Sequence, residues 1–114
     1  MSYKNLKERI KINEGYSNKP YKDQLGFYTI GYGHLIKKNE KKYFNKEFDK
    51  DYFNKLFILD FNNALKDYKN SLYNKSHSSY EKELLIEMIF QLGLKGVLKF
   101  KKMIFYLNKK EKYM

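Results

Sequence analysis

Two acidic residues and a threonine occur within one short stretch of this sequence, NEGYSNKPYKDQLGFYTIGYGH. Glu14 lies at the end of an amphipathic segment, Asp23 lies at a turn, and Thr29 follows on the returning segment. Two carboxylates and a hydroxyl that can hold water, placed around a cleft, are what acid-catalysed glycoside hydrolysis needs. We therefore treat these three side chains as candidate catalytic residues.

Each candidate also has a purely structural explanation. Glu14 would lie at the negative end of a helix dipole, which disfavours its ionised form and suits a proton donor, but a surface glutamate at a helix end is common. Asp23 is equally well suited to forming the turn itself. Thr29 is β-branched, and strands favour such residues without any functional reason. The residue types alone leave both explanations open.

The spacing of apolar residues predicts the elements that must position these side chains. Leu6 and Ile10 recur at helical spacing, and Gly15 is expected to end this first helix. From residue 16 to residue 36 the period changes, which predicts short strands around a turn at residues 23–26.

Three further helices are expected. Asp49 should cap the longest helix, whose apolar stripe comprises Phe53, Leu56, Phe57, Phe61, Ala64, Leu65, Tyr68 and Leu72. Ser78 and Glu81 form a capping-box pattern for the next helix. Its expected buried residues are Leu84, Leu85, Met88, Ile89 and Leu92, and Gly93 should end it. A final helix is expected over residues 97–107.

Composition limits the class of protein. With 114 residues, 42% of them hydrophobic, the chain can form one folded domain. It has no cysteines and only two histidines, so we expect neither a metal ion nor a cofactor. No apolar run reaches the roughly 18 residues of a membrane span, and the N-terminal residues lack the apolar core of a signal peptide.

The formal net charge of +11 favours anionic partners such as nucleic acid, an anionic membrane or acidic cell-wall polymers. A basic nucleic-acid-binding module is therefore the alternative outside enzymes. Against it, lysines are spread over all segments, arginine occurs only at Arg9, and no recognition helix or zinc module is visible. We expect no specific nucleic-acid partner.

The stretch around Glu14 resembles the phage-type (T4-like) lysozymes, the endolysin family. The family's E-G, Y-K-D and G-F-Y-T-I-G-Y-G-H-L segments occur here, with the spacings from Glu14 to Asp23 and from Asp23 to Thr29 intact. An F-Q-L-G segment of the same family occurs at residues 90–93. A gapless match of this kind is more specific than an isolated pair of acidic residues.

The resemblance implies an α+β, lysozyme-like fold, in which a long helix joins a small N-terminal β-hairpin lobe to a mainly helical lobe. It predicts a single lysozyme-like domain over residues 1–114. Residues 1–48 would form the N-terminal lobe with the catalytic hairpin. Residues 49–114 would form the long connecting helix and an incomplete helical lobe.

The resemblance also implies a role for each catalytic candidate. Glu14 would be the general acid, Asp23 would stabilise the oxocarbenium-like transition state, and Thr29 would hold the attacking water, which implies inversion. The substrate would be bacterial peptidoglycan, cleaved at the β-1,4 bond between N-acetylmuramic acid and N-acetylglucosamine for wall degradation and host lysis. Such an enzyme would be made in the host cytoplasm and reach the wall after holin-assisted release.

Five further residues match family positions. Leu35, Phe90 and Gln91 match residues that line the sugar-binding cleft, although core packing explains Leu35 and Phe90 equally well. His34 and Asp60 match a structural pair that ties the lobes together.

The resemblance ends near Leu107, whereas family members continue into further helices. Those helices normally supply an arginine close to the catalytic glutamate and an asparagine in the cleft. Met103 also stands where the family would place a polar serine. We therefore expect an uncovered helical face, and either a monomer or weak self-association through that face. The residues expected near it are Leu6, Ile10, Phe100 and Ile104. A truncated form that binds peptidoglycan with little or no turnover is the alternative function.

Overall fold

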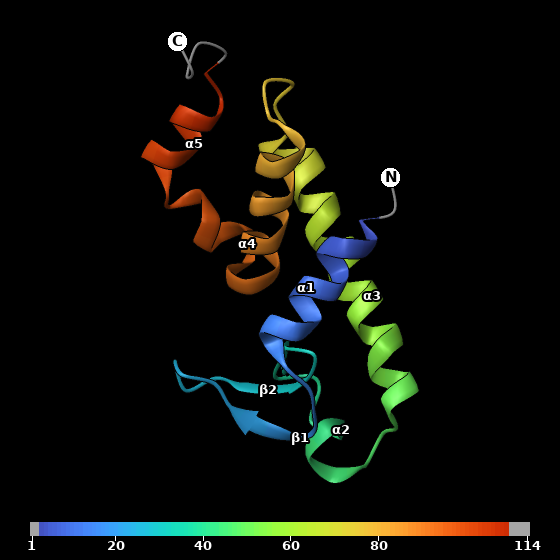
Figure 1. Ribbon diagram of the computed structural model, residues 1–114. Helices are drawn as coiled ribbons and strands as arrows, with labels where there is room; N and C mark the ends of the chain where they lie inside the picture. The colour runs from blue at the N-terminus through green and yellow to red at the C-terminus, as the bar shows by residue number, and fades with distance from the viewer. Residues whose placement is uncertain (1–2, 110–114) are drawn as a thin grey trace. The chain divides into compact units, whose positions relative to one another are not determined.

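A computed structural model describes residues 3–109 and contains helices and one small antiparallel sheet (Figure 1). In chain order the elements are α1 (Lys4–Glu14), β1 (Ser17–Lys22), β2 (Tyr28–Gly31), β3 (His34–Leu35), α2 (Lys42–Asn45), α3 (Lys50–Asp67), the π-helical η1 (Tyr68–Leu72), α4 (Ser79–Leu98) and α5 (Lys101–Leu107). The expected α+β fold class is confirmed. The chain forms two compact units, Met1–Asp60 and Phe61–Met114, and the boundary falls inside α3. Within residues 3–109 no helix is both long and apolar enough to cross a membrane.

The sheet of the first unit has the strand order β1-β2-β3, with both pairs antiparallel. Thr29 on β2 lies opposite Tyr21 on β1 and opposite Leu35 on β3, so these three side chains form one row across one face. Ile30 and His34 are also opposite each other, and their side chains occupy the other face. Ile30 joins Tyr43 and Phe53 in the buried core of this unit.

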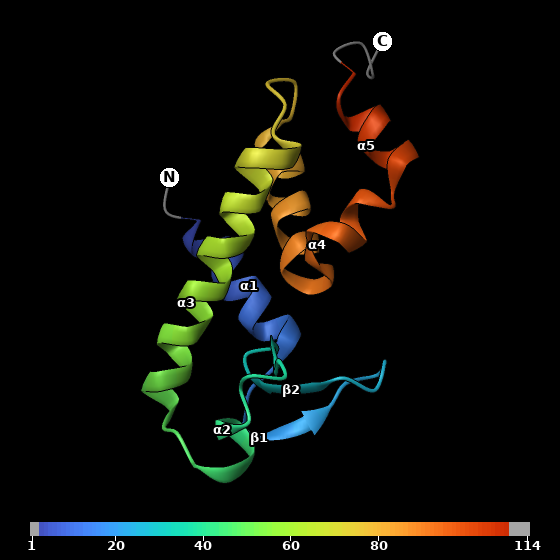
Figure 2. The same cartoon turned by 180° about the vertical axis from the view of Figure 1, so that it is seen from behind.

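Helix α1 places its apolar stripe inside the protein. Leu6 and Ile10 are 1% and 0% exposed, so the expectation that they border an uncovered face was wrong. Lys11 Nζ donates a hydrogen bond of 3.0 Å to Asn54 Oδ1 and so joins α1 to α3. The two helices lie side by side in both views (Figure 1 and Figure 2). Phe100, by contrast, is 46% exposed.

Helix α3 begins where the sequence predicts. Asp49 Oδ1 accepts a 2.8 Å hydrogen bond from the Tyr52 N–H, which is the expected cap. Most of the predicted stripe is buried: Phe53, Phe57, Phe61, Ala64, Tyr68 and Leu72. The last two residues of this stripe lie in the wider π-helical turn η1, which the spacing of apolar residues did not reveal.

The second unit contains α4, which begins with the expected capping box. The Ser78 hydroxyl accepts a bond from the Glu81 N–H, and the Glu81 carboxylate accepts one from the Ser78 N–H, at 3.1 and 2.8 Å. Gly93, with φ 76° and ψ 159°, breaks the helical backbone, so that α4 consists of two helical segments that meet at a kink there, as the expected helix end at Gly93 predicted. Leu92 is 49% exposed just before this interruption, whereas Ile86 is fully buried, so the predicted buried face was partly wrong.

The final helix is shorter than predicted. Val97 belongs to the end of α4, and α5 begins only at Lys101, because Phe100 has a non-helical backbone conformation. A buried imidazole ties the end of α5 to η1. His77 Nδ1 accepts a 2.6 Å bond from the Tyr68 hydroxyl, and His77 Nε2 donates a 2.7 Å bond to Asn108 Oδ1.

A second buried imidazole, His34, links three parts of the first unit. Its Nδ1 lies 2.8 Å from Asp60 Oδ2 on α3, and its Nε2 lies 3.0 Å from Glu40 Oε1 in the loop before α2. Glu40 Oε1 also accepts a 3.0 Å bond from the Lys37 N–H. An imidazole that donates from both nitrogens to carboxylates carries a positive charge. Glu40 was not anticipated, because nothing in its sequence neighbourhood connects it with His34.

The pKa values of His34 and Glu40 are shifted in opposite directions. Burial alone would lower the pKa of His34, but the bonds and charges of Asp60 and Glu40 raise it above its ordinary 6.5. Burial acts to raise the pKa of Glu40, yet the Lys37 N–H and His34 lower it below its ordinary 4.5. The stability that depends on His34 is therefore complete below pH 6.5 and lost as pH rises through its folded-state pKa. The stability that depends on Glu40 is complete above pH 4.5 and lost as pH falls through its lower folded-state pKa.

We therefore predict a plateau between pH 4.5 and 6.5 in the stability that this cluster contributes. Urea unfolding of the parent and of His34→Gln at a series of pH values should show the largest difference in free energy of unfolding inside this window. Asp51→Asn is a control, because it removes an exposed ion pair with Lys55 that contributes little. A parent–variant difference that stays constant from acidic to alkaline pH would contradict the charged cluster.

Candidate functional site

The carboxylate of Glu14 lies directly against the turn between β2 and β3. Glu14 is the last residue of α1. A methyl group on Gly33 would overlap Glu14 Oε1 and would lie 3.0 Å from its Cδ. Gly33 also has φ +80°, a conformation that residues with a side chain rarely adopt. The glycine therefore serves two purposes, because it permits the turn and leaves room for the carboxylate.

The carboxylate of Asp23 is held by the β1–β2 hairpin. Asp23 Oδ1 accepts hydrogen bonds of 2.9 Å from the N–H groups of Leu25 and Phe27. The Asp23 N–H also donates a 2.8 Å hydrogen bond to the Phe27 carbonyl. The turn-forming explanation and the catalytic one are thus compatible, since the turn fixes the position of this carboxylate.

Thr29 presents an oriented hydroxyl on the same hairpin. Its side chain is 6% exposed, and its Oγ1 donates a 3.2 Å bond to the Phe27 carbonyl. Because the hydroxyl proton is used in this bond, the lone pairs of the oxygen point elsewhere and can accept a hydrogen bond from another molecule.

Tyr21 lies among these groups and was not singled out from the sequence. It is paired with Thr29 across the β1–β2 ladder. Burial, followed by the negative charges of Glu14 and Asp23, raises the pKa of the Tyr21 phenol. The phenol therefore stays protonated beside both carboxylates. The sequence contained one indication of this position. Tyr21 lies two residues before Asp23, and alternate residues of an extended segment share a face.

Leu35 completes the row formed by Tyr21 and Thr29, and its side chain is 50% exposed. An exposed leucine beside Tyr21 and Thr29 can contact a ligand. Phe90 and Gln91 belong to α4 in the second unit, where Phe90 is partly buried and Gln91 is exposed. Their role in binding substrate stays a prediction. His34 and Asp60 are hydrogen-bonded in the cluster described above, on the sheet face opposite Thr29.

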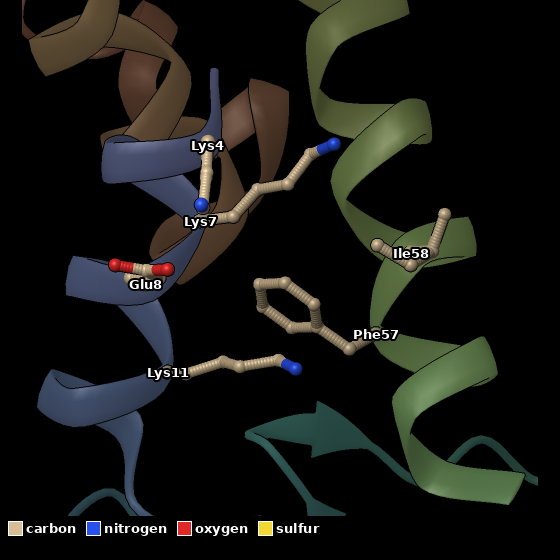
Figure 3. A pocket seen from close by; sticks show the side chains of 6 residues that line it. All are labelled: Lys4, Lys7, Glu8, Lys11, Phe57 and Ile58. Atoms are coloured by element: carbon tan, nitrogen blue, oxygen red, sulfur yellow. The ribbon is translucent and has the colours of Figure 1, made fainter. Parts of the chain in front are cut away.

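A separate groove lies between α1 and α3 (Figure 3). Its volume is about 360 Å³, and it is lined by Lys4, Lys7, Glu8, Lys11, Phe57 and Ile58. Figure 3 shows the Phe57 ring and the side chains of Lys7 and Lys11 directed into the space between the helices. Only one carboxylate, that of Glu8, borders the groove. It therefore does not supply the two carboxylates that acid-catalysed glycoside hydrolysis uses.

Comparisons with known proteins agree with this geometry. The sequence model of the family Phage lysozyme matches residues 11–113. The protein named probable T4-type lysozyme 2 of Dictyostelium discoideum is 32% identical over 130 aligned residues, which cover 93% of this chain and 76% of that relative. The probable T4-type lysozyme 1 of the same organism is 30% identical over 119 residues, covering 84% of this chain and 70% of the relative. The chain therefore belongs to the phage lysozyme family of glycoside hydrolases, as its Glu14, Asp23 and Thr29 segment predicted.

Proposed function

We propose that this protein hydrolyses the β-1,4 bond between N-acetylmuramic acid and N-acetylglucosamine in peptidoglycan, with Glu14 as the general acid. The observation that supports this most directly is the placement of Glu14 against Gly33, in the same compact unit as Asp23 and Thr29. The net charge of +11 suits a substrate whose peptide stems and attached polymers carry negative charge. Degradation of the bacterial wall, leading to lysis, would be the biological outcome.

In the proposed mechanism the two carboxylates have different tasks. Glu14 donates its proton to the glycosidic oxygen as the bond to the anomeric carbon breaks. Asp23 stays ionised and stabilises the positive charge that develops on the sugar. Both backbone hydrogen bonds fall on Oδ1 of Asp23, so Oδ2 is the oxygen that we assign to this task.

The attacking water is assigned to Thr29. The Thr29 hydroxyl donates to the Phe27 carbonyl, so its oxygen is available to accept a hydrogen bond from the water. A water held there attacks the anomeric carbon from the face opposite the leaving group and gives up its proton to the Asp23 carboxylate, which inverts the configuration. Leu35, next to Thr29 in the row, provides apolar contact for the sugar ring.

The first test removes the proton donor. Glu14→Gln should lower the rate at which purified walls yield new reducing ends by about 10²- to 10⁴-fold. Glu8→Gln is the matched control, because it makes the same change on the same helix at a residue that borders the separate groove. An active Glu14→Gln variant, or a parent that binds walls and releases no reducing ends, would contradict the proposed hydrolysis.

The second test concerns the water and the stereochemistry. Proton NMR of a soluble oligosaccharide during hydrolysis should show the α-anomer before mutarotation, since attack on a β-linkage from the opposite face inverts it. Thr29→Val keeps the shape of this buried side chain and removes the hydroxyl. The value of kcat should therefore fall, while KM should change little. Thr29→Ser should retain most activity. Initial formation of the β-anomer would exclude this role for Thr29.

The third test concerns the space above Gly33. Gly33→Ala should displace the Glu14 carboxylate and lower kcat by about 10²-fold, a loss typical of a misplaced catalytic group. Gly93→Ala is the matched control, because Gly93 also has a positive φ, of 76°, but open space around its Cβ position. Both variants should lose some thermal stability from backbone strain. Equal activity losses in the two variants would show that strain, and not contact with Glu14, matters.

A further inference from the structure

A second hollow of about 530 Å³ lies in the first unit, on the sheet face opposite Thr29. Its lining includes three aromatic residues, the buried Tyr43 and the exposed Tyr28 and Phe44, together with Asn18, Lys19, Asn45 and Lys46. We propose that this hollow is a non-catalytic binding site for the glycan strand of peptidoglycan. This inference rests on the proposed function for the identity of the ligand, and it concerns none of the residues assigned to catalysis.

The strand geometry places the hollow away from the catalytic row. Tyr28 precedes Thr29 on β2 and is paired with Lys22. Because successive side chains of a strand point to opposite faces, Tyr28 projects from the face opposite Thr29. Helix α2 contributes Phe44 and Asn45 from the other side of the hollow. The volume falls within the 300–1,000 Å³ or so that is typical of small-ligand sites.

The aromatic pair provides a surface for sugar rings. The Tyr28 and Phe44 rings are perpendicular, with centroids 5.1 Å apart, and the residues are 45% and 49% exposed. Covering water-exposed aromatic rings with an apolar surface is favourable, because it removes apolar area from water. The C–H faces of a pyranose are such a surface, and its hydroxyl groups can still reach the polar rim.

The polar rim matches the functional groups of an N-acetylated glycan. Asn18 and Asn45 each carry an amide that can both donate and accept, as the hydroxyl and acetamido groups of the sugars require. Asn45 Nδ2 donates to the Lys41 carbonyl at 3.3 Å, which orients its Oδ1 as an acceptor. Few other polymers combine apolar ring faces with such a dense set of donors and acceptors.

The charges favour a glycan that carries carboxylates. Lys19 and Lys46 border the hollow with a single acidic residue, Glu47. Lys22 adds a third positive charge, with its Nζ 5.3 Å from the centre of the Tyr28 ring. The muramic acid lactyl groups and peptide stems of peptidoglycan would meet these cations, whereas a neutral glycan would gain only the aromatic and amide contacts. A strand held here keeps the enzyme on the polymer between cleavage events.

The test measures binding and turnover separately. In a Glu14→Gln background, Tyr28→Ala and Phe44→Ala should each weaken binding to purified sacculi by about tenfold in a pelleting assay. In the active background both variants should cleave a short soluble oligosaccharide as fast as the parent, while their rate on sacculi falls. Tyr80→Ala is the matched control, since Tyr80 is 75% exposed on α4 and lies in the second unit.

A measurement on the unaltered aromatic pair covers the case of a variant that does not fold. A soluble muropeptide added to the Glu14→Gln protein should shift the NMR side-chain amide signals of Asn18 and Asn45. A chitin oligosaccharide should shift them less, because it lacks carboxylates. Unshifted amide signals, or unchanged binding by both folded variants, would overturn the glycan site while leaving the proposed hydrolysis intact.

Two further outcomes separate the inference from the proposed function. A parent that hydrolyses nothing, yet binds sacculi through Tyr28 and Phe44, would support the site and overturn the proposed hydrolysis. Tighter binding of single-stranded oligothymidine than of muropeptide at this hollow would overturn the glycan assignment, since basic and aromatic residues also suit single-stranded nucleic acid.

Discussion

The pairing register of the three short strands is the constraint on which the rest of the first unit depends. Because Thr29 lies opposite both Tyr21 and Leu35, one face of the sheet carries the Thr29 hydroxyl and its neighbours. The same register sends Ile30 and His34 to the other face, where they meet the core and the charged cluster. A slip of one residue would exchange the two faces completely. Few hydrogen bonds define so short a sheet, so its register needs support from outside the strands.

Two kinds of side-chain contact supply that support. At the turn of the β1–β2 hairpin, the Asp23 carboxylate accepts hydrogen bonds from the N–H groups of Leu25 and Phe27 and so determines where β2 begins. At the other edge, the charged His34 imidazole connects β3 to Asp60 of α3 and to Glu40. Acidic residues therefore stabilise the sheet at both ends, and in the proposed mechanism one of them also takes part in catalysis.

Sequence reasoning succeeded where the determining forces are local. The Asp49 cap, the Ser78 and Glu81 capping box and the end of α1 at Gly15 each depend on contacts a few residues apart. The catalytic candidates were found through a gapless segment whose positions also lie close in sequence.

Sequence reasoning failed where contacts join segments that are distant along the chain. The bond between His34 and Glu40 crosses a loop without periodicity, and the meeting of Tyr28 with Phe44 requires α2 to lie against β1. The enclosure of Leu6 and Ile10 depends on tertiary packing, which spacing along one helix does not report.

The contact between Glu14 and Gly33 has a consequence for how this protein can evolve. The two residues occupy one shared volume, so the size of the side chain at either position limits the size at the other. A lineage cannot acquire even a methyl group at position 33 while keeping a glutamate in its present rotamer at position 14. The shorter aspartate would make the room but would withdraw the acid from its place. The two sites therefore form an epistatic pair, in which a side chain at position 33 requires a different rotamer or a smaller residue at position 14.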